Sequence, residues 1–166
     1  LGDVYKRQSL QIKLLIEQIR FIEAQVDDVE AEIKVILKKL NSPITTIPGI
    51  GDVTAAAILG EIGDISRFSN ASKLAAYAGI DASVRQSGEY RSSHNKMSKR
   101  GSPYLRKALF LAAKNVAAYD PVFSAFYQKK RAEGKHHLTA IGAVARKLCN
   151  TIFAILKYNK PYTCQN

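Results

Sequence analysis

The chain has 166 residues, of which 46% are hydrophobic, and it carries a formal net charge of +11 at pH 7. This length and apolar content allow one buried core plus an appendage, and they exclude a wholly disordered chain. Seven Lys or Arg balance seven Asp or Glu in residues 1–40, so the whole basic excess lies in residues 41–166. Such an excess favours a polyanionic partner, nucleic acid before membrane, although a basic surface that merely keeps the protein in solution is the alternative.

The cysteine and histidine pattern indicates a reducing cytoplasm and no metal site within this chain. Cys149 falls in an apolar helical pattern and Cys164 lies near the end, with no Cys-x-x-Cys spacing. His94, His136 and His137 lack companions at metal-ligand spacing. No run of 18 apolar residues predicts a membrane span. We therefore predict a cytoplasmic location, no membrane partner and no cofactor bound by these residues.

The first eight residues, LGDVYKRQ, differ in pattern from the segment that begins at Ser9. They begin without Met and resemble a translated sequencing adapter, so residues 1–8 are interpreted as a non-native leader and left out of the fold prediction. On this interpretation the chain is a fragment, and a segment is missing upstream of Ser9.

Residues 9–42 predict one long coiled-coil helix. Apolar residues recur at spacings of three and four over four heptads, without an intervening Gly or Pro, at Ile12, Leu15, Ile19, Ile22, Val26, Val29, Ile33, Ile36 and Leu40. At about 1.5 Å per residue the helix would be about 45 Å long. We predict a homo-oligomer formed through residues 12–40, and a helix within an intramolecular bundle is the alternative.

Residues 43–160 predict a compact, mainly α domain, followed by a tail over residues 161–166. Thr45 to Gly63 predicts a helix, a glycine turn and a second helix around a small core of Ile47, Ile50, Val53, Ala57 and Ile58. A third helix over about 70–78 is capped by Asn70 or Ser69 and closed by Gly79.

Three further helices come after a polar insertion over residues 81–101. They begin at Ser102-Pro103, at Pro121 and at about residue 137, and the second of them ends at Gly134. The inward face of the last helix is predicted to be Leu138, Ile141, Val144, Ala145, Leu148, Ile152, Ile155 and Leu156. Within the insertion, RQSGEYR predicts two short strands about a turn at Gly88.

The turn IPGIG predicts an anion site in the manner of a helix-hairpin-helix motif. Gly49 and Gly51 would bare successive N–H groups at the N-terminus of the next helix, and Thr54 would add a hydroxyl group. Such a site would hold a phosphate without reading bases. The alternative is a tight turn whose small residues let helices approach each other.

The polar insertion and the helix after it concentrate positive charge. The basic residues there, opposed by Glu89, are Arg85, Arg91, Lys96, Lys99, Arg100, Arg106, Lys107 and Lys114. Tyr90 and Tyr104 lie between them and could stack on bases. We predict that this segment binds nucleic acid, and a solvated charged loop is the alternative.

Ser87 is the candidate nucleophile, although a loop serine is by default only a solvated residue. Gly88 comes next in the chain, and arginines lie two residues before and four residues after Ser87. These cations could neutralise a phosphodiester during transesterification. The sequence supports no Ser-His-Asp arrangement.

Three segments in this order resemble a known family: IPGIGDVTAAAILGEIGDISRFSNASKLAAYAGI, SGEYR and MSKRGSPYLRKALFLAA. They are similar to the C-terminal half of insertion-sequence transposases that join a RuvC-like, four-carboxylate (DEDD) half to a serine-bearing half. The Piv-type DNA invertases and the bridge-RNA-guided recombinases belong to this family. The resemblance covers about residues 10–160.

The resemblance implies a role for each segment. The heptad helix corresponds to the coiled coil between the two halves, IPGIG to the helix-hairpin-helix-like segment, and Ser87 to the serine that forms a 5′-phosphoserine link to DNA. The basic run to Lys107 would lie along nucleic acid, and the resemblance leaves open whether a guide RNA is used. The acidic half, where Mg²⁺ is expected, is absent from this chain.

We therefore predict a fragment of a DNA transposase that binds nucleic acid and self-associates but does not recombine DNA alone. A non-catalytic helix-hairpin-helix module that binds DNA or RNA is the first alternative. A coiled-coil scaffold with an incidentally basic domain is the second.

Overall fold

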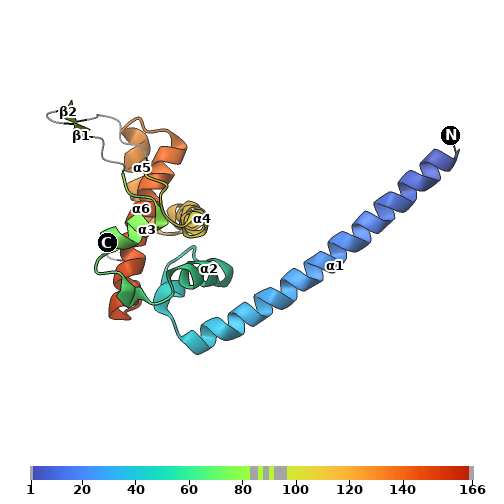
Figure 1. Ribbon diagram of the computed structural model, residues 1–166, viewed down its shortest axis with the longest axis horizontal. Coiled ribbons are helices and arrows are strands. Elements are labelled where there is room, and N and C mark those ends of the chain that lie inside the picture. The colour runs from blue at the N-terminus through green and yellow to red at the C-terminus, as the bar shows by residue number, and fades with distance from the viewer. Residues whose placement is uncertain (1, 83–85, 88–89, 92–96, 165–166) are drawn as a thin grey trace. The chain divides into compact units, whose positions relative to one another are not determined.

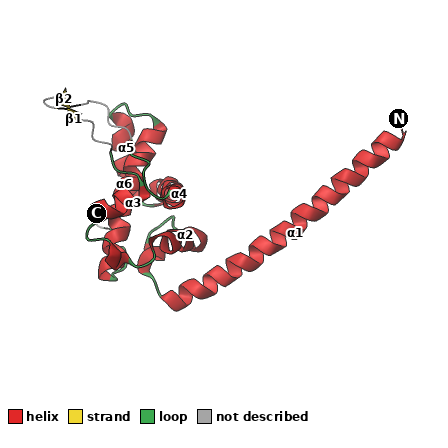
Figure 2. Cartoon of the chain, viewed as in Figure 1, coloured by secondary structure: helices red, strands yellow, loops and turns green. Residues whose placement is uncertain are grey.

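The computed structural model describes residues 2–82, 86–87, 90–91 and 97–164 (Figure 1). It describes side chains for residues 7–82 and 97–164. The described residues form six α-helices, two short 3-10 helices and one two-stranded hairpin, which confirms the predicted mainly α fold (Figure 2). The chain divides into two compact units, residues 1–40 and residues 41–166.

The first unit is one helix, α1 (Gly2–Leu40). It begins earlier than predicted, because residues 3–8 contain no Gly or Pro and continue the helix. The interpretation of residues 1–8 as a non-native leader stays a prediction. The helix ends at Leu40 as expected, and Asn41 leaves it with a φ of +46°.

The heptad positions of α1 are exposed. Eight of the nine, from Ile12 to Leu40, are 49–60% exposed, and Ile33 is half-buried. The predicted helix is confirmed, whereas its self-association stays a prediction.

The second unit contains the core. Its elements are η1 (Pro43–Thr46), α2 (Asp52–Ile62), η2 (Ile65–Arg67), α3 (Ala71–Ala78), β1 (Gln86–Ser87), β2 (Tyr90–Arg91), α4 (Pro103–Tyr119), α5 (Pro121–Ala132) and α6 (His137–Tyr158). Helix α6 packs against α3, α4 and α5, and α2 packs against α4 (Figure 1). The hairpin is antiparallel and pairs Ser87 with Tyr90, as the pattern RQSGEYR predicted.

The structure corrects the predicted helix before the glycine turn. The segment Pro43–Thr46 is a single 3-10 turn and not an α-helix. Its residues after Pro43 are three β-branched residues, which disfavour a longer helix.

The predicted core around the glycine turn is only partly right. Val53 is 46% exposed and Ala57 is also exposed, whereas Ile47, Ile50 and Ile58 are buried as predicted. Since α2 begins at Asp52, its inward stripe at helical spacing is Ala55, Ile58 and Ile62, all of which are at most 1% exposed.

Local capping signals located the other helix boundaries correctly. The Asn70 side chain accepts a hydrogen bond from the Lys73 N–H group at 3.0 Å, and Gly79 ends α3 with a φ of +66°. Ser102 Oγ accepts from the Leu105 N–H group at 3.1 Å at the start of α4. Gly134, after α5, has a φ of +78°.

Helix α6 is the core helix of this unit. Six of its eight predicted inward residues are buried, but Leu138 is 56% exposed and Leu156 is half-buried. Leu138 lies in the first turn of the helix, where it lines an open cleft. Among the described residues, α6 is the helix that is long and apolar enough to cross a membrane, and its apolar residues form the centre of the core.

Candidate nucleic-acid interface

A cleft of about 1100 Å³ opens between the base of the hairpin, α4 and the start of α6. Five cationic side chains line it, from elements far apart in the sequence: Lys99, Arg106, Lys107, Lys135 and Arg146. One carboxylate, that of Asp81, lies among them. The cleft therefore presents an excess of positive charge to any ligand that enters it, which suits a phosphate-bearing ligand.

Two residues that flank the hairpin segment in the sequence lie at the edge of this cleft. Ala82 and Met97 form an antiparallel bridge, and both residues line the cleft. The Ser98 N–H group donates to the Asp81 carbonyl at 2.9 Å, and the Ser98 hydroxyl donates to the Asp81 carboxylate. These bonds fix the two chain ends from which the hairpin extends.

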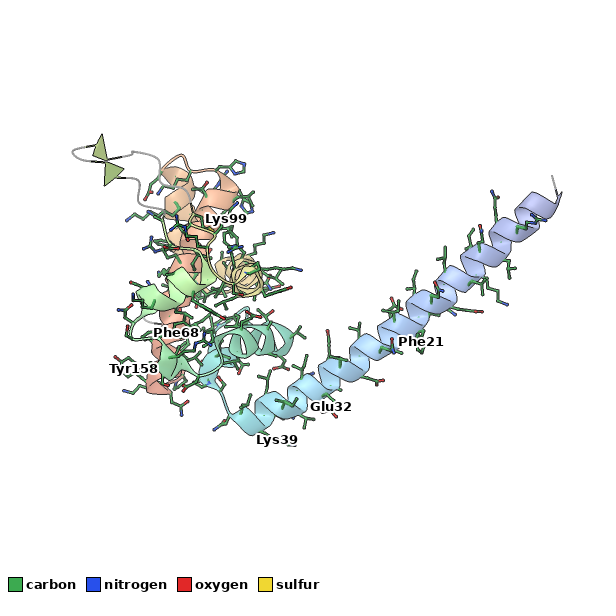
Figure 3. The ribbon with its side chains drawn as sticks, in the orientation of Figure 1. Phe21, Glu32, Lys39, Phe68, Lys99 and Tyr158 are labelled. Carbon is green, nitrogen blue, oxygen red and sulfur yellow. The ribbon has the colours of Figure 1, made fainter. Side chains whose placement is uncertain are left out.

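Lys99 is held beside the C-terminus of α3. Its N–H group donates to the Gly79 carbonyl at 3.0 Å, and its φ is +55°. Figure 3 labels its side chain, which is exposed. A non-glycine residue in this backbone region is uncommon, and the surrounding bonds hold it there.

Arg106 has a packing role as well as a place in the cleft. Its Nη1 atom donates to the Ala78 carbonyl at 3.2 Å, and the residue is half-buried. The guanidinium thereby satisfies a carbonyl at the C-terminus of α3, where positive charge is favourable. Lys107 is exposed on the next position of α4.

Two of the five cations, Lys135 and Arg146, were not among the binding residues predicted from the sequence. Lys135 Nζ lies 3.1 Å from Glu133 Oε2, and Lys130 Nζ lies 2.9 Å from Glu133 Oε1. Hydrogen bonds from Lys130 and then Lys135 lower the pKa of Glu133. Arg146 comes after Leu138 and Gly142 at spacings of four on α6, and all three line the cleft. That spacing predicts a shared face, but not what lies opposite to it.

The predicted residues of the insertion divide into three groups. Lys99, Arg106 and Lys107 line the cleft, whereas the exposed Arg100 does not. The backbones of Ser87 and Arg91 lie in the hairpin strands, and their side chains lie outside the described structure. Arg85, Gly88 and Lys96 lie outside the described residues altogether.

The two glycines of the IPGIG turn have different surroundings. Gly49 has a φ of +93°, and a Cβ atom added there would lie 2.8 Å from backbone atoms of Asn115 and Val116 in α4. Gly49 thus permits both the turn and its close packing on α4. A Cβ atom added at Gly51 would meet nothing within 4 Å.

Phosphate binding at this turn stays a prediction. Gly51 precedes the first residue of α2 and no side chain caps that end. However, Asp52 lies in the first turn of α2 and would disfavour an anion there. Thr54 is half-buried.

The residues present do not fit the Mg²⁺ ion that the family resemblance implies. Within the described part of the chain, no three His, Cys, Asp or Glu side chains converge to hold a metal ion. The described carboxylates of the second unit do not cluster, and the Asp81 carboxylate accepts a hydrogen bond from the Ser98 hydroxyl.

Known proteins resemble this chain over most of its length. Residues 41–128 match the model of the transposase IS116/IS110/IS902 family. The chain is 34% identical over 152 residues to an insertion element IS110 protein of Streptomyces coelicolor, which covers 90% of this chain and 37% of that protein. It is 36% identical over 122 residues to the pilin gene-inverting protein of Moraxella bovis, which covers 73% of this chain and 38% of that protein.

These similarities define the class as DNA transposases and recombinases. The chain belongs to the IS116/IS110/IS902 transposase family. An insertion element IS900 protein of Mycobacterium paratuberculosis is also 30% identical over 151 residues. The chain spans less than two fifths of the length of these relatives, with 37–38% of each covered.

Proposed function

We propose that this chain is the serine-bearing, C-terminal part of a DEDD-type transposase, and that it binds DNA in the cationic cleft and supplies Ser87 as the nucleophile for strand exchange. One observation carries the proposal. The segment that contains Ser87 is flanked in the chain by Ala82 and Met97, which form an antiparallel bridge and line a cleft with five cationic side chains.

The chemistry assigned to Ser87 is a transesterification. The Ser87 Oγ atom attacks a backbone phosphorus, a new Oγ–P bond forms, and the bond from phosphorus to the 3′ oxygen breaks. The hydroxyl proton leaves Ser87, and the departing 3′ oxygen takes up a proton. The products are a 5′-phosphoserine and a free 3′ hydroxyl, and attack by another 3′ hydroxyl reverses the step on a new strand.

The role of the cleft cations is electrostatic. Lys99, Lys107 and Arg146 line the cleft, and in this proposal they would stabilise the negative charge that develops on the phosphodiester during the attack. Such charges act by stabilising the transition state, and they also position the strand. Arg106, which also holds the end of α3, would fix the orientation of this surface.

Other parts of the proposed machinery lie outside the described cleft. Mg²⁺ and its acidic ligands are assigned to an N-terminal half, as the resemblance to four-carboxylate transposases implies. Self-association is assigned to residues 12–40, whose apolar heptad positions are largely exposed. A guide RNA would be a second polyanionic partner for the same basic unit. We also propose that the protein is located in the cytoplasm.

Trapping of the covalent intermediate tests the assignment of Ser87. A full-length protein containing this chain is incubated with substrate DNA, and the protein–DNA adduct is measured on denaturing gels. Ser87→Ala should abolish the adduct, whereas Ser93→Ala, in the same insertion, should retain it. An undiminished adduct in Ser87→Ala would remove Ser87 as the nucleophile.

Binding to nucleic acid is tested with the present chain. Five phosphate contacts would give a slope of log affinity on log salt of about −4 to −5 on duplex DNA. Absence of binding to DNA and RNA at low salt would refute the interface.

A binding module without chemistry is the second candidate, because the described cleft cations do not depend on the Ser87 hydroxyl group. In that case Ser87→Ala would lower affinity slightly, and no adduct would form with either the parent protein or the variant.

A further inference from the structure

The cleft has an apolar floor in addition to its cationic rim. Met97, Phe110 and Leu138 line it together with Gly142 and Ala143 of α6. Leu138 is 56% exposed, although it lies in an otherwise apolar helix pattern. Contact with duplex phosphates requires the rim but gives no reason for the apolar floor.

Gly142 lies in this floor beside Phe110 and Met97. A Cβ atom added there would lie 3.5 Å from Phe110 Cζ and 3.7 Å from Met97 Cε, so these three residues meet at one point. These are ordinary contact distances, so a methyl group would fit, and glycine is not required by sterics. Glycine in a helix interior is less favourable than alanine. An absent side chain at such a position leaves room for a ligand to approach the helix.

Charge and apolar surface together match one class of ligand. In a duplex the bases are stacked and their faces are covered, whereas an unpaired nucleotide presents both a base face and a phosphate. The cleft volume of about 1100 Å³ is slightly above the usual range for small-molecule sites, about 300–1,000 Å³, so a nucleotide has room to enter.

We propose that this cleft receives an unpaired nucleotide of the bound strand, with its base against Met97, Phe110 and Leu138 and its phosphate on the cationic rim. This inference rests on the proposed function, because it specifies which form of nucleic acid the interface takes. Lys99 and Arg146 of the rim then bind the phosphates next to a base that has left its stack.

Filling the floor tests the inference. Gly142→Leu places a large side chain between Phe110 and Met97 and leaves every rim cation in place. Gly60→Leu is the matched control, since Gly60 is also a helix glycine, does not line the cleft, and has nothing within 4 Å of an added Cβ atom. The probes are a duplex, the same duplex with one extrahelical adenine, and a single strand, each measured by fluorescence anisotropy.

The parent chain should bind the probes with an unpaired base more tightly than the duplex. Stacking on a protein surface contributes about 1–3 kcal/mol per base. The ratio of the affinity for an unpaired-base probe to the affinity for the duplex should therefore fall about tenfold in Gly142→Leu. Its duplex affinity and salt slope should match those of the parent and of Gly60→Leu. An unchanged preference in Gly142→Leu would overturn the inference while leaving the interface intact.

A second variant avoids the buried part of the helix. Leu138→Ser replaces an exposed apolar side chain that lines the cleft. Leu111→Ser is its control, because Leu111 is 52% exposed on α4 and does not line the cleft. Leu138→Ser should weaken binding of the extrahelical adenine probe and leave duplex binding unchanged. Equal effects of the two serine variants would also overturn the inference. Failure of the parent chain to bind any probe would instead refute the proposed function.

Discussion

Gly101 lies where the chain leaves the hairpin and enters α4, and its surroundings leave no room for a side chain. A Cβ atom there would lie 1.8 Å from the carbonyl oxygen of Tyr77, a backbone atom that cannot move independently. The neighbouring Ser102 N–H group donates to the same oxygen at 2.6 Å. The path of the segment that carries Lys99 into the cleft therefore depends on the glycine.

Gly101→Ala should destabilise the protein by about 2–4 kcal/mol, because the segment must shift and lose its bonds to α3. Gly142→Ala is the contrast, since its added methyl group meets only ordinary contacts, and it should change stability by no more than about 1 kcal/mol in the favourable direction. Urea unfolding followed by circular dichroism measures both. Equal loss of stability in the two variants would contradict this difference.

The two cysteines differ in their environments. Cys149 is buried in α6, and burial raises the pKa of its thiol to about 12. Cys164 is exposed. Since the thiolate is the reactive form, only the exposed thiol should react readily at neutral pH.

A disulfide reagent at pH 8 should therefore modify one thiol per folded chain quickly and the second only on unfolding. Cys164→Ser should abolish the fast phase. Between pH 9.0 and about 12 the Cys149 thiol ionises in the unfolded chain before the folded one, so its contribution to stability is full below that window and is lost as pH rises through it. A fast phase of two thiols in the folded chain would show that Cys149 is accessible.

At the scale of elements, α1 differs from every helix of the second unit. The apolar heptad positions of α1 are mostly exposed, whereas the apolar side chains of α6 are mostly buried. Apolar positions at a strict seven-residue repeat are matched by a second helix with the same repeat. This supports a second copy of the chain as the partner of α1.

Ile22→Lys should therefore dissociate the assembly. Burial of one isoleucine side chain contributes about 1.5–3 kcal/mol, so the dissociation constant should rise at least about tenfold. Ala24→Lys is the control, because residue 24 lies on the opposite face of the heptad. Light scattering after size exclusion measures the mass. A parent chain that is monomeric at all concentrations would refute self-association through residues 12–40.

At the scale of the whole molecule, charge and core both belong to the second unit. The net charge of residues 1–40 is zero, so the excess of +11 lies in residues 41–166. Apart from Leu37, the buried apolar side chains of the described residues lie between Ile44 and Ile155. The second unit thus has its own core and its own basic surface.

Removal of residues 1–40 should leave a folded, nucleic-acid-binding domain. Its thermal midpoint should stay within about 5 °C of the parent value, the shift that about 1 kcal/mol produces in a domain of this size. The slope of its log affinity for nucleic acid on log salt should be unchanged, because the cleft cations remain. Its affinity should fall only by the factor that linking two binding sites in one assembly contributes. Scanning calorimetry and anisotropy titrations check both statements, and a truncated chain that does not unfold cooperatively would contradict them.

Features that depend on near neighbours could be predicted from the sequence. The caps at Asn70 and Ser102, the turn at Gly79 and the heptads of α1 result from contacts within one or two helical turns, which a linear pattern records. The sequence also located the basic excess, the hairpin and the family motifs.

The tertiary structure alone decided which distant residues meet. Lys135 and Arg146 join Lys99 and Lys107 in one cleft because α6 packs against α3 and α4. The structure also shows that the two glycines of the IPGIG turn have different surroundings. Gly49 faces the backbone of α4, whereas Gly51 faces open space. Helical periodicity specifies which side of a helix is apolar, but the partner of that side depends on packing between segments far apart in the chain, and no local pattern encodes it.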